Sequence, residues 1–267
     1  MRTRTTATSP ASDVAHRVGQ FFFGVGLLLR GFAIYVREPR LMLLGLIPAI
    51  VTGLLFLGAL VTLAYTSPKL AALLTPFADD WADWLQTLVR VSVIVALLGV
   101  AGLVGVLTFT GVTLAIGDPC YERISEWVED RCGGVANRVE VSWLRSLGWG
   151  IADSIRMVAV SVAVGVPLFV AGFLPVVGQT VVPVLGAVLG GWLLALELTG
   201  GPFERRGRRL ADRRQALGAV RMATLGFGTS VFLAFVIPLG AILFTPAAVA
   251  GATLLTRHAL NEPVDEA

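Results

Sequence analysis

Long uncharged stretches alternate with short charged segments along the chain. Four stretches of at least 26 residues contain no charged side chain, namely 41–66, 91–117, 157–196 and 222–256. A helix needs about 20 apolar residues to cross a bilayer. The first two stretches therefore predict long transmembrane helices at 39–66 and 91–117, the former beginning at Pro39, because proline suits the first position of a helix.

Prolines interrupt the last two uncharged stretches: Pro167, Pro175 and Pro183 in the first, Pro238 and Pro246 in the second. Proline removes a backbone donor and clashes with the preceding turn, so each stretch is divided into short pieces. Stretches of 40 and 35 residues leave little room for two full spans and a turn, which need more than about 40 residues. They favour re-entrant helical hairpins at 157–196 and 222–256. Two thin spans in each stretch are the alternative.

Residues 18–36 are apolar apart from Arg30. They predict an interfacial helix whose arginine reaches the headgroups; the alternative is a span with a buried arginine, which costs at least about 2.5 kcal/mol. Residues 1–17 contain too little apolar surface to order themselves, so we expect a disordered basic tail there. Residues 259–267 form a polar tail.

Residues 119–132 predict an amphipathic cytosolic helix. The residues of its apolar stripe recur at helical spacing: Tyr121, Ile124, Trp127 and Val128. Its acidic residues, Glu129 among them, are expected to face water.

The composition indicates a membrane protein. Only 15% of the residues are charged, against about 25% in soluble domains, and the mean hydropathy is +0.79. Together with the apolar runs, these values predict an all-α integral membrane protein: two long transmembrane helices, two proline-broken hemi-penetrating hairpins and amphipathic interfacial helices. The net charge of +3 is too small to indicate a nucleic-acid partner.

Arginine is concentrated in two segments that flank apolar runs. Residues 1–40 contain six arginines and residues 197–221 contain seven, whereas residues 67–90 carry two cations and three aspartates. The positive-inside rule places the first two segments in the cytoplasm and the third outside. We therefore expect a multi-pass protein of the cell membrane whose N- and C-termini are cytoplasmic.

Three blocks of the sequence resemble a known family. The run GFGTSVFLAFVIPLGAILFTPAAVAGATLL at 226–255 is similar to the C-terminal signature of the CysZ sulfate permease and etoposide-induced membrane protein family. REPRLMLLGLIP (37–48) and GDPCYERISEWVED (117–130) resemble two further blocks, and the resemblance covers residues 18–258, a single membrane domain. It implies two long transmembrane helices joined by two hemi-penetrating hairpins, and sulfate uptake that feeds cysteine biosynthesis.

Sulfate permeases of this family resemble one another in a Gly-Leu-Arg motif just after the proline that opens the first long helix. Here the aligned residues are Arg40, Leu41 and Met42, so only the leucine matches. A helix N-terminus still offers an anion unpaired N–H groups and a partial positive charge. Arg37 and Arg40 add formal charge, and Glu38 opposes them. The alternative is that both arginines only anchor the helix end at the headgroups.

Further candidates lie near the hairpin ends. Arg221, Gly226 and Gly228 open the last hairpin, where flexible glycines could expose N–H groups to an anion, although close helix packing explains them at least as well. Glu197 is deeply flanked by apolar residues and is a candidate for proton coupling, unless it marks the cytosolic end of its hairpin. The cluster RRGRRLADRR at 205–214 either attracts anions to a pore mouth or fixes topology and binds anionic lipid.

No feature of the sequence predicts an enzyme. His16 and His258 are isolated, no Cys/His cluster has metal spacing, and no nucleotide-binding loop or ATPase domain is evident. We expect neither a metal nor a cofactor. Re-entrant backbone must be buried by protein or line a wet cavity, which predicts a homo-oligomer or bundle around a polar centre. Two hypotheses follow: an anion permease, expected for sulfate, or a non-transporting protein that binds or remodels lipid through its hairpins and arginine-rich loop.

Overall fold

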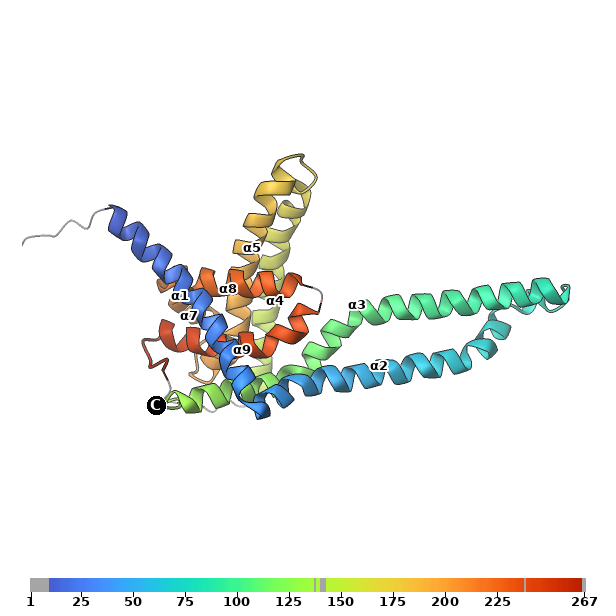
Figure 1. The fold of residues 1–267 in the computed structure, drawn as a ribbon, viewed down its shortest axis with the longest axis horizontal. Helices are drawn as coiled ribbons and strands as arrows, with labels where there is room; N and C mark the ends of the chain where they lie inside the picture. Colours follow the sequence, from blue (N-terminus) through green and yellow to red (C-terminus); the bar gives the residue numbers. More distant parts are fainter. Residues whose placement is uncertain (1–9, 137, 140–142, 238, 266–267) are drawn as a thin grey trace, which may run out of the picture. The chain divides into compact units, whose positions relative to one another are not determined.

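The computed structural model describes residues 10–136, 138–139, 143–237 and 239–265, and all secondary structure in these ranges is helical (Figure 1). In chain order the elements are α1 (Pro10–Arg37), α2 (Pro39–Leu74), the 3₁₀ helix η1 (Pro76–Ala78), α3 (Asp83–Arg131), α4 (Trp143–Ala171), α5 (Val177–Leu198), α6 (Gly200–Glu204), α7 (Leu210–Ala219), α8 (Arg221–Val236) and α9 (Gly240–Ala259). Within the described ranges, six helices are long and apolar enough to cross a membrane. The predicted all-helical class is confirmed, and the helices are compatible with a membrane protein.

The helix α2 is longer than the sequence predicts. It continues past residue 66 to Leu74 and passes through Pro68. A proline leaves the carbonyl four residues earlier without its helical partner, here that of Ala64. Ser67 fills the gap, because its Oγ donates to the oxygen of Ala64 at 2.8 Å. The side chain thus repairs the helix where the backbone cannot.

Two other boundaries also differ from expectation. The helix α3 is continuous over 49 residues and joins the predicted helices 91–117 and 119–132. The helix α1 begins at Pro10, so the second half of the tail expected to be disordered is helical, with proline in the favoured first position. Residues 1–9 lie outside the described residues.

The chain divides into two units. One is Leu43–Cys120, in which α2 and α3 lie side by side: the rings of Phe56 and Phe109 meet edge to face with centroids 5.6 Å apart. The other combines Met1–Met42 with Tyr121–Ala267 and holds α1, the start of α2, the end of α3 and α4 to α9.

Within the larger unit, α8 packs against α1, α5 and α9 through small residues. A Cβ added to Gly226 would lie 1.9 Å from the carbonyl oxygen of Phe21 in α1, and one added to Gly228 would lie 2.0 Å from that of Gly191 in α5. Such close approach of backbones is typical of helix packing in membranes. Phe227, between the two glycines, is fully buried.

The first apolar stretch with prolines breaks at Pro175. α4 ends at Ala171 and α5 begins at Val177, whereas Pro167 and Pro183 lie inside these helices. Figure 1 shows α4 and α5 lying alongside each other. How far this hairpin crosses the bilayer stays a prediction.

The second stretch breaks between Val236 and Gly240; Pro238 itself lies outside the described residues. The prediction that Pro246 also turns the chain is wrong, because Pro246 is the seventh residue of α9 and the helix continues through it. A proline there removes one intrahelical hydrogen bond, which close packing offsets: the next residue, Ala247, lies against Gly31 of α1. α9 is accordingly the most buried of the long apolar helices.

Candidate functional site

The predicted anion site lies where α1 meets α2. α1 ends at Arg37, and α2 begins two residues later at Pro39. The N–H groups of Leu41 and Met42 both donate to the carbonyl oxygen of Glu38, at 3.0 and 3.1 Å. Two of the donors that a helix start offers to a ligand are therefore already used by the chain itself.

The side chains at this junction point to different environments. Arg37 and Arg40 are exposed, Met42 is half-exposed, and Leu41 is buried. The hydroxyl of Tyr35 donates to the carbonyl oxygen of Met42 at 3.3 Å. The junction therefore brings two exposed guanidinium groups to the start of α2, while the one residue that matches the family motif packs inward.

Glu38, the acid that opposes anion binding in the sequence, has a cationic partner. Arg131, the last residue of α3, donates from Nη2 to its Oε1 at 2.9 Å. The guanidinium of Arg131 also lies 4.6 Å from the ring centroid of Trp127, which adds a cation–π contact. Pairing offsets the charge of Glu38 and leaves a positive surface at the junction.

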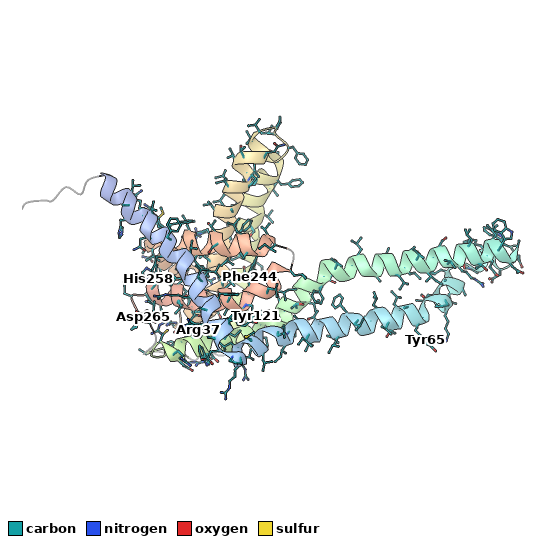
Figure 2. All side chains as sticks on the ribbon, viewed as in Figure 1. Arg37, Tyr65, Tyr121, Phe244, His258 and Asp265 are labelled. Atoms are coloured by element: carbon teal, nitrogen blue, oxygen red, sulfur yellow. The ribbon has the colours of Figure 1, made fainter. Side chains whose placement is uncertain are left out.

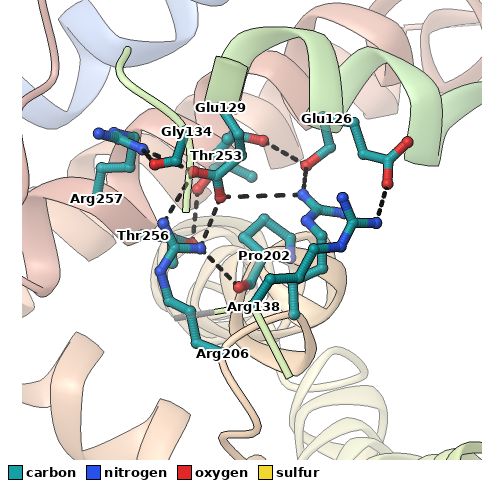
Figure 3. A network of polar contacts seen from close by, with 12 residues as sticks. Glu126, Glu129, Gly134, Arg138, Pro202, Arg206, Thr253, Thr256 and Arg257 are labelled. Carbon is teal, nitrogen blue, oxygen red and sulfur yellow. Dashed lines mark hydrogen bonds and ion pairs between the residues drawn. The ribbon is translucent and has the colours of Figure 1, made fainter. Parts of the chain in front are cut away.

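A second polar cluster surrounds Glu129 (Figure 3). The prediction that Glu129 faces water is wrong, because its side chain is only 2% exposed. It lies four residues after Ser125 and three before Cys132, which are both buried, so it belongs to the inward face of α3. Helical spacing alone would have placed Glu129 on the buried face, but its charge favoured the prediction that it faces water.

Arg206 is the main partner of Glu129, and it uses all five of its N–H donors. Nη1 and Nη2 donate to the two carboxylate oxygens of Glu129 at 2.6 and 2.8 Å. Nη1 also donates to the carbonyl of Pro202 at 2.8 Å. On the opposite edge, Nε donates to Oε1 of Glu262 at 2.9 Å, and Nη2 donates to its Oε2.

Arg257 approaches Glu129 from α9. Its Nη1 donates to Oε2 of Glu129 at 2.8 Å and to the carbonyl of Gly134 at 2.9 Å, and its Nη2 donates to the carbonyl of Cys132. Its Nε donates to the carbonyl of Pro263 at 2.6 Å. These bonds hold α9, the end of α3 and the C-terminal segment together.

Arg205 is the least satisfied member of the cluster. Its side chain is 7% exposed, its Nη2 donates to Ser125 Oγ, and Nη2 lies 3.9 Å from Oε1 of Glu129. Its Nε and Nη1 have no hydrogen-bond partner among the described residues. Burial lowers the pKa of Arg205, and the nearby carboxylates, led by Glu129, only partly oppose this effect.

A cavity of about 210 Å³ lies beside Arg205. It is lined by Glu126, Glu129, Asp130, Val135, Arg138 and Arg205. Three carboxylates and two guanidinium groups give this lining no preference for an anion. The described residues contain no group of three or more His, Cys, Asp or Glu side chains placed to hold a metal ion.

The remaining candidates lie on α5 and α8. Gly226 and Gly228 lie inside α8, beyond the first four residues whose N–H groups lack helical partners, and they make the close contacts that the packing interpretation expects. Arg221 is exposed at the first position of α8. Glu197 is exposed in the last turn of α5, and its role in proton coupling stays a prediction.

The arginine-rich segment 205–214 has two kinds of members. Arg205 and Arg213 are buried, and the side chain of Arg206 is almost as inaccessible. Arg208, Arg209 and Arg214 are exposed. The sequence contains no signal that separates the two sets, because partners from distant segments decide which arginines are covered.

Comparison with protein families identifies a relationship that covers the α1–α2 junction and the part of the second cluster before α9. The family described as sulfate transporter CysZ/etoposide-induced protein 2.4 matches residues 27–246. The match includes the α1–α2 junction, Glu129 and the arginine-rich segment, and it covers well over half of the sequence. Together with the long apolar helices, it indicates a multi-pass membrane protein. The chain therefore belongs to the sulfate transporter CysZ/etoposide-induced protein 2.4 family.

Proposed function

We propose that this protein is a membrane permease for an inorganic anion, with sulfate as the expected substrate, and that the imported sulfate feeds cysteine biosynthesis. The family match over residues 27–246 carries this proposal, because the family is described by sulfate transport. Helices that are long and apolar enough to cross a membrane support it.

The α1–α2 junction is the proposed point of anion recognition. Arg37 and Arg40 are exposed beside the N-terminus of α2, and Glu38 is paired with Arg131. A positive surface raises the local concentration of anions, and a helix N-terminus adds a partial positive charge. Arg40 stands two positions before the arginine of the family's Gly-Leu-Arg motif, and we propose that it replaces that arginine as the anion's ion-pair partner.

Uptake of radiolabelled sulfate into liposomes that contain the purified protein tests the proposal. We expect flux above that of empty liposomes, and a loss of about tenfold in Arg40→Ala, which corresponds to about 1.4 kcal/mol. Arg156→Ala is the matched control, because Arg156 is also exposed on a helix and its ion pair with Asp153 is long at 3.8 Å. Absence of flux with protein shown to be folded would refute the permease.

We further propose that the permease is a homo-oligomer of the cell membrane with both termini in the cytoplasm, and that it works without an ATPase subunit. None of the membrane-length window of the apolar helix α4 is buried within the chain, so lipid or a second copy of the chain covers it, and the proposed oligomer is the second case. Cross-linking in native membranes tests the oligomer; a monomer across all protein concentrations would contradict it.

The alternative function is lipid binding without transport. Exposure of Arg208, Arg209 and Arg214 favours it, because these side chains can reach anionic headgroups. The test is retention of anionic lipid by the detergent-purified protein. Neutralising Arg208 and Arg214 should abolish selective retention if this function holds, and unchanged retention would count against it.

A further inference from the structure

The C-terminal segment after α9 folds back onto the larger unit. Glu262 contacts Arg206, the carbonyl of Pro263 accepts from Arg257, and Asp265 forms an ion pair of 3.3 Å with Arg30 of α1. In the described part of the expected polar tail, Glu262, Pro263 and Asp265 thus attach the chain to the helices through Arg206, Arg257 and Arg30.

Glu262 binds Arg206 as a small oxyanion would. Its two oxygens accept from Nε and Nη2, the outer edge of the guanidinium, in a two-point fork. Glu129 holds the inner edge through Nη1 and Nη2. Glu129 is buried on α3, so this half of the guanidinium's hydrogen bonds does not depend on the tail. Nη1 of Arg257 lies 3.6 Å from Oε2 of Glu262, on the same side.

The charges make this position hard to leave empty. Three buried guanidinium groups, those of Arg205, Arg206 and Arg257, face Glu129, and Glu262 is a second carboxylate in contact with Arg206 and Arg257. Without Glu262, the guanidinium groups of Arg206 and Arg257 share the single carboxylate of Glu129, an excess of one positive charge. Unpaired buried charge is strongly unfavourable. The negative charge of an oxyanion in the place of Glu262 would balance it.

The exposed fractions of the side chains distinguish the two arginines, which are buried, from Glu262, which lies over them. The side chain of Arg206 is 7% exposed and that of Arg257 is 3% exposed, whereas Glu262 is 31% exposed. Arg138, whose partner Glu126 accepts from its Nη2, lies at the neighbouring cavity, so Glu126 does not compete for Arg206. Glu262 is therefore the partner that solvent reaches, and the two arginines lie beneath it.

We propose that Arg206 and Arg257 form an oxyanion-binding site that the Glu262 carboxylate occupies in this conformation, and that a tetrahedral oxyanion displaces the tail. The ligand chemistry is that of inorganic sulfate or phosphate and equally that of a lipid phosphate. The proposal concerns binding alone and does not rest on transport, so loss of one leaves the other standing.

The fraction of time for which the tail occupies the site determines how much it weakens the affinity for an oxyanion. When a site is available for only a fraction of the time, the apparent affinity falls by that fraction. A tail bound for more than nine-tenths of the time lowers the affinity at least about tenfold, and removing its carboxylate restores that factor.

Calorimetric titration of the full-length protein in neutral detergent tests the site. Sodium sulfate is compared with sodium chloride at equal ionic strength. We expect Glu262→Ala to bind sulfate at least about tenfold more tightly than the wild type. Glu126→Gln is the matched control: it removes an acid beside the cluster without uncovering Arg206, and its affinity should stay within about twofold of the wild type.

The fork is tested on the Glu262→Ala background. Arg206→Lys keeps the charge but loses the two-point geometry, so the gained affinity should disappear. If that variant does not fold, Arg257→Lys on the same background is measured instead, and the gained sulfate affinity should again disappear. Equal sulfate affinity of Glu262→Ala and wild type would overturn the proposal, as would an equal gain in Glu126→Gln.

Nanodiscs distinguish the two sources of the oxyanion. Tighter sulfate binding by Glu262→Ala in neutral-lipid nanodiscs assigns the site to a free anion. A gain seen only as retention of phosphatidylglycerol assigns it to lipid phosphate. If neither gain is observed, the site is refuted, whatever the result of the flux assay.

Discussion

The guanidinium of Arg206 and the carboxylate of Glu129 meet edge to edge, with Nη1–Oε1 at 2.6 Å and Nη2–Oε2 at 2.8 Å. Both side chains are more than nine-tenths buried. Burial alone would lower the pKa of Arg206, but the hydrogen bonds to Glu129 and Glu262 outweigh burial and raise it. The pair fixes the end of α3 to the segment between α6 and α7. Figure 2 shows that the side chains along the helices consist mostly of carbon.

Replacing Glu129 by alanine should destabilise the protein severely. It leaves Arg205, Arg206 and Arg257 buried with their main carboxylate removed, which costs about 3–5 kcal/mol. The control is Glu126→Gln, because the ion pair of Glu126 with Arg138 is largely exposed and contributes about 0–1 kcal/mol. Thermal unfolding in detergent measures both. Equal losses in the two variants would show that Glu129 has no special structural role.

The apolar stripe around Glu129 shows which features of the site could be predicted from the sequence. Charge alone places this residue in water, yet Tyr121, Ile124 and Val128, whose stripe the sequence predicts, are buried beside it. Spacing could have included Glu129. Its partners could not have been found, because Arg206 and Arg257 come from segments 77 and 128 residues away. Local periodicity identifies a buried face, whereas long-range pairing depends on the packed helices.

The prolines also show what local sequence predicts and what depends on the packed structure. Their number predicts interrupted helices, and Pro175 does lie at a break. Pro68 and Pro246 lie inside helices, because Ser67 supplies a replacement hydrogen bond in one case and close packing surrounds the other. The helix α2 also begins where Pro39 predicts it. A proline therefore marks a possible break, and its neighbours decide whether the chain turns.

Acid should release the C-terminal segment. Burial alone would raise the pKa of Glu262, but the hydrogen bond from Arg206 and the charges of Arg206, Arg257 and Arg208 outweigh it and hold that pKa below its usual 4.5. A depressed pKa stabilises the fold above about pH 4.5, and this contribution is lost as the pH falls through the lower value of the folded protein. Glu129 contacts the same arginines, so it is left unmutated in both proteins and the difference between them reports on Glu262 alone.

Melting temperatures of the wild type and Glu262→Gln between pH 7 and pH 3 measure this contribution. The two proteins should differ most at neutral pH and converge in acid, because protonated Glu262 resembles glutamine. Parallel profiles over the whole range would contradict a stabilising role for the Glu262 carboxylate.

The close contact of α8 with α1 should not tolerate one methyl group. In Gly226→Ala the new Cβ would lie 1.9 Å from the carbonyl oxygen of Phe21, so the helices must move apart at a cost of about 1–3 kcal/mol. Gly218→Ala in α7 is the control, since nothing lies within 4 Å of its Cβ, and there alanine should stabilise the helix by up to about 1 kcal/mol. Denaturation in detergent compares them; a neutral Gly226→Ala would be inconsistent with this packing.

Breaking the pair between Glu38 and Arg131 should weaken the proposed sulfate uptake through charge alone. Arg131→Gln leaves the Glu38 carboxylate unpaired beside Arg37 and Arg40, where it repels an approaching anion. Both partners are partly exposed, so the effect is about 0.2–1 kcal/mol, or up to about fivefold in uptake. Adding Glu38→Gln removes the repelling charge and should restore uptake in the double variant, although the contact of Arg131 with Trp127 stays lost. Uptake that remains low in the double variant would show that Arg131 acts through Trp127 rather than through Glu38.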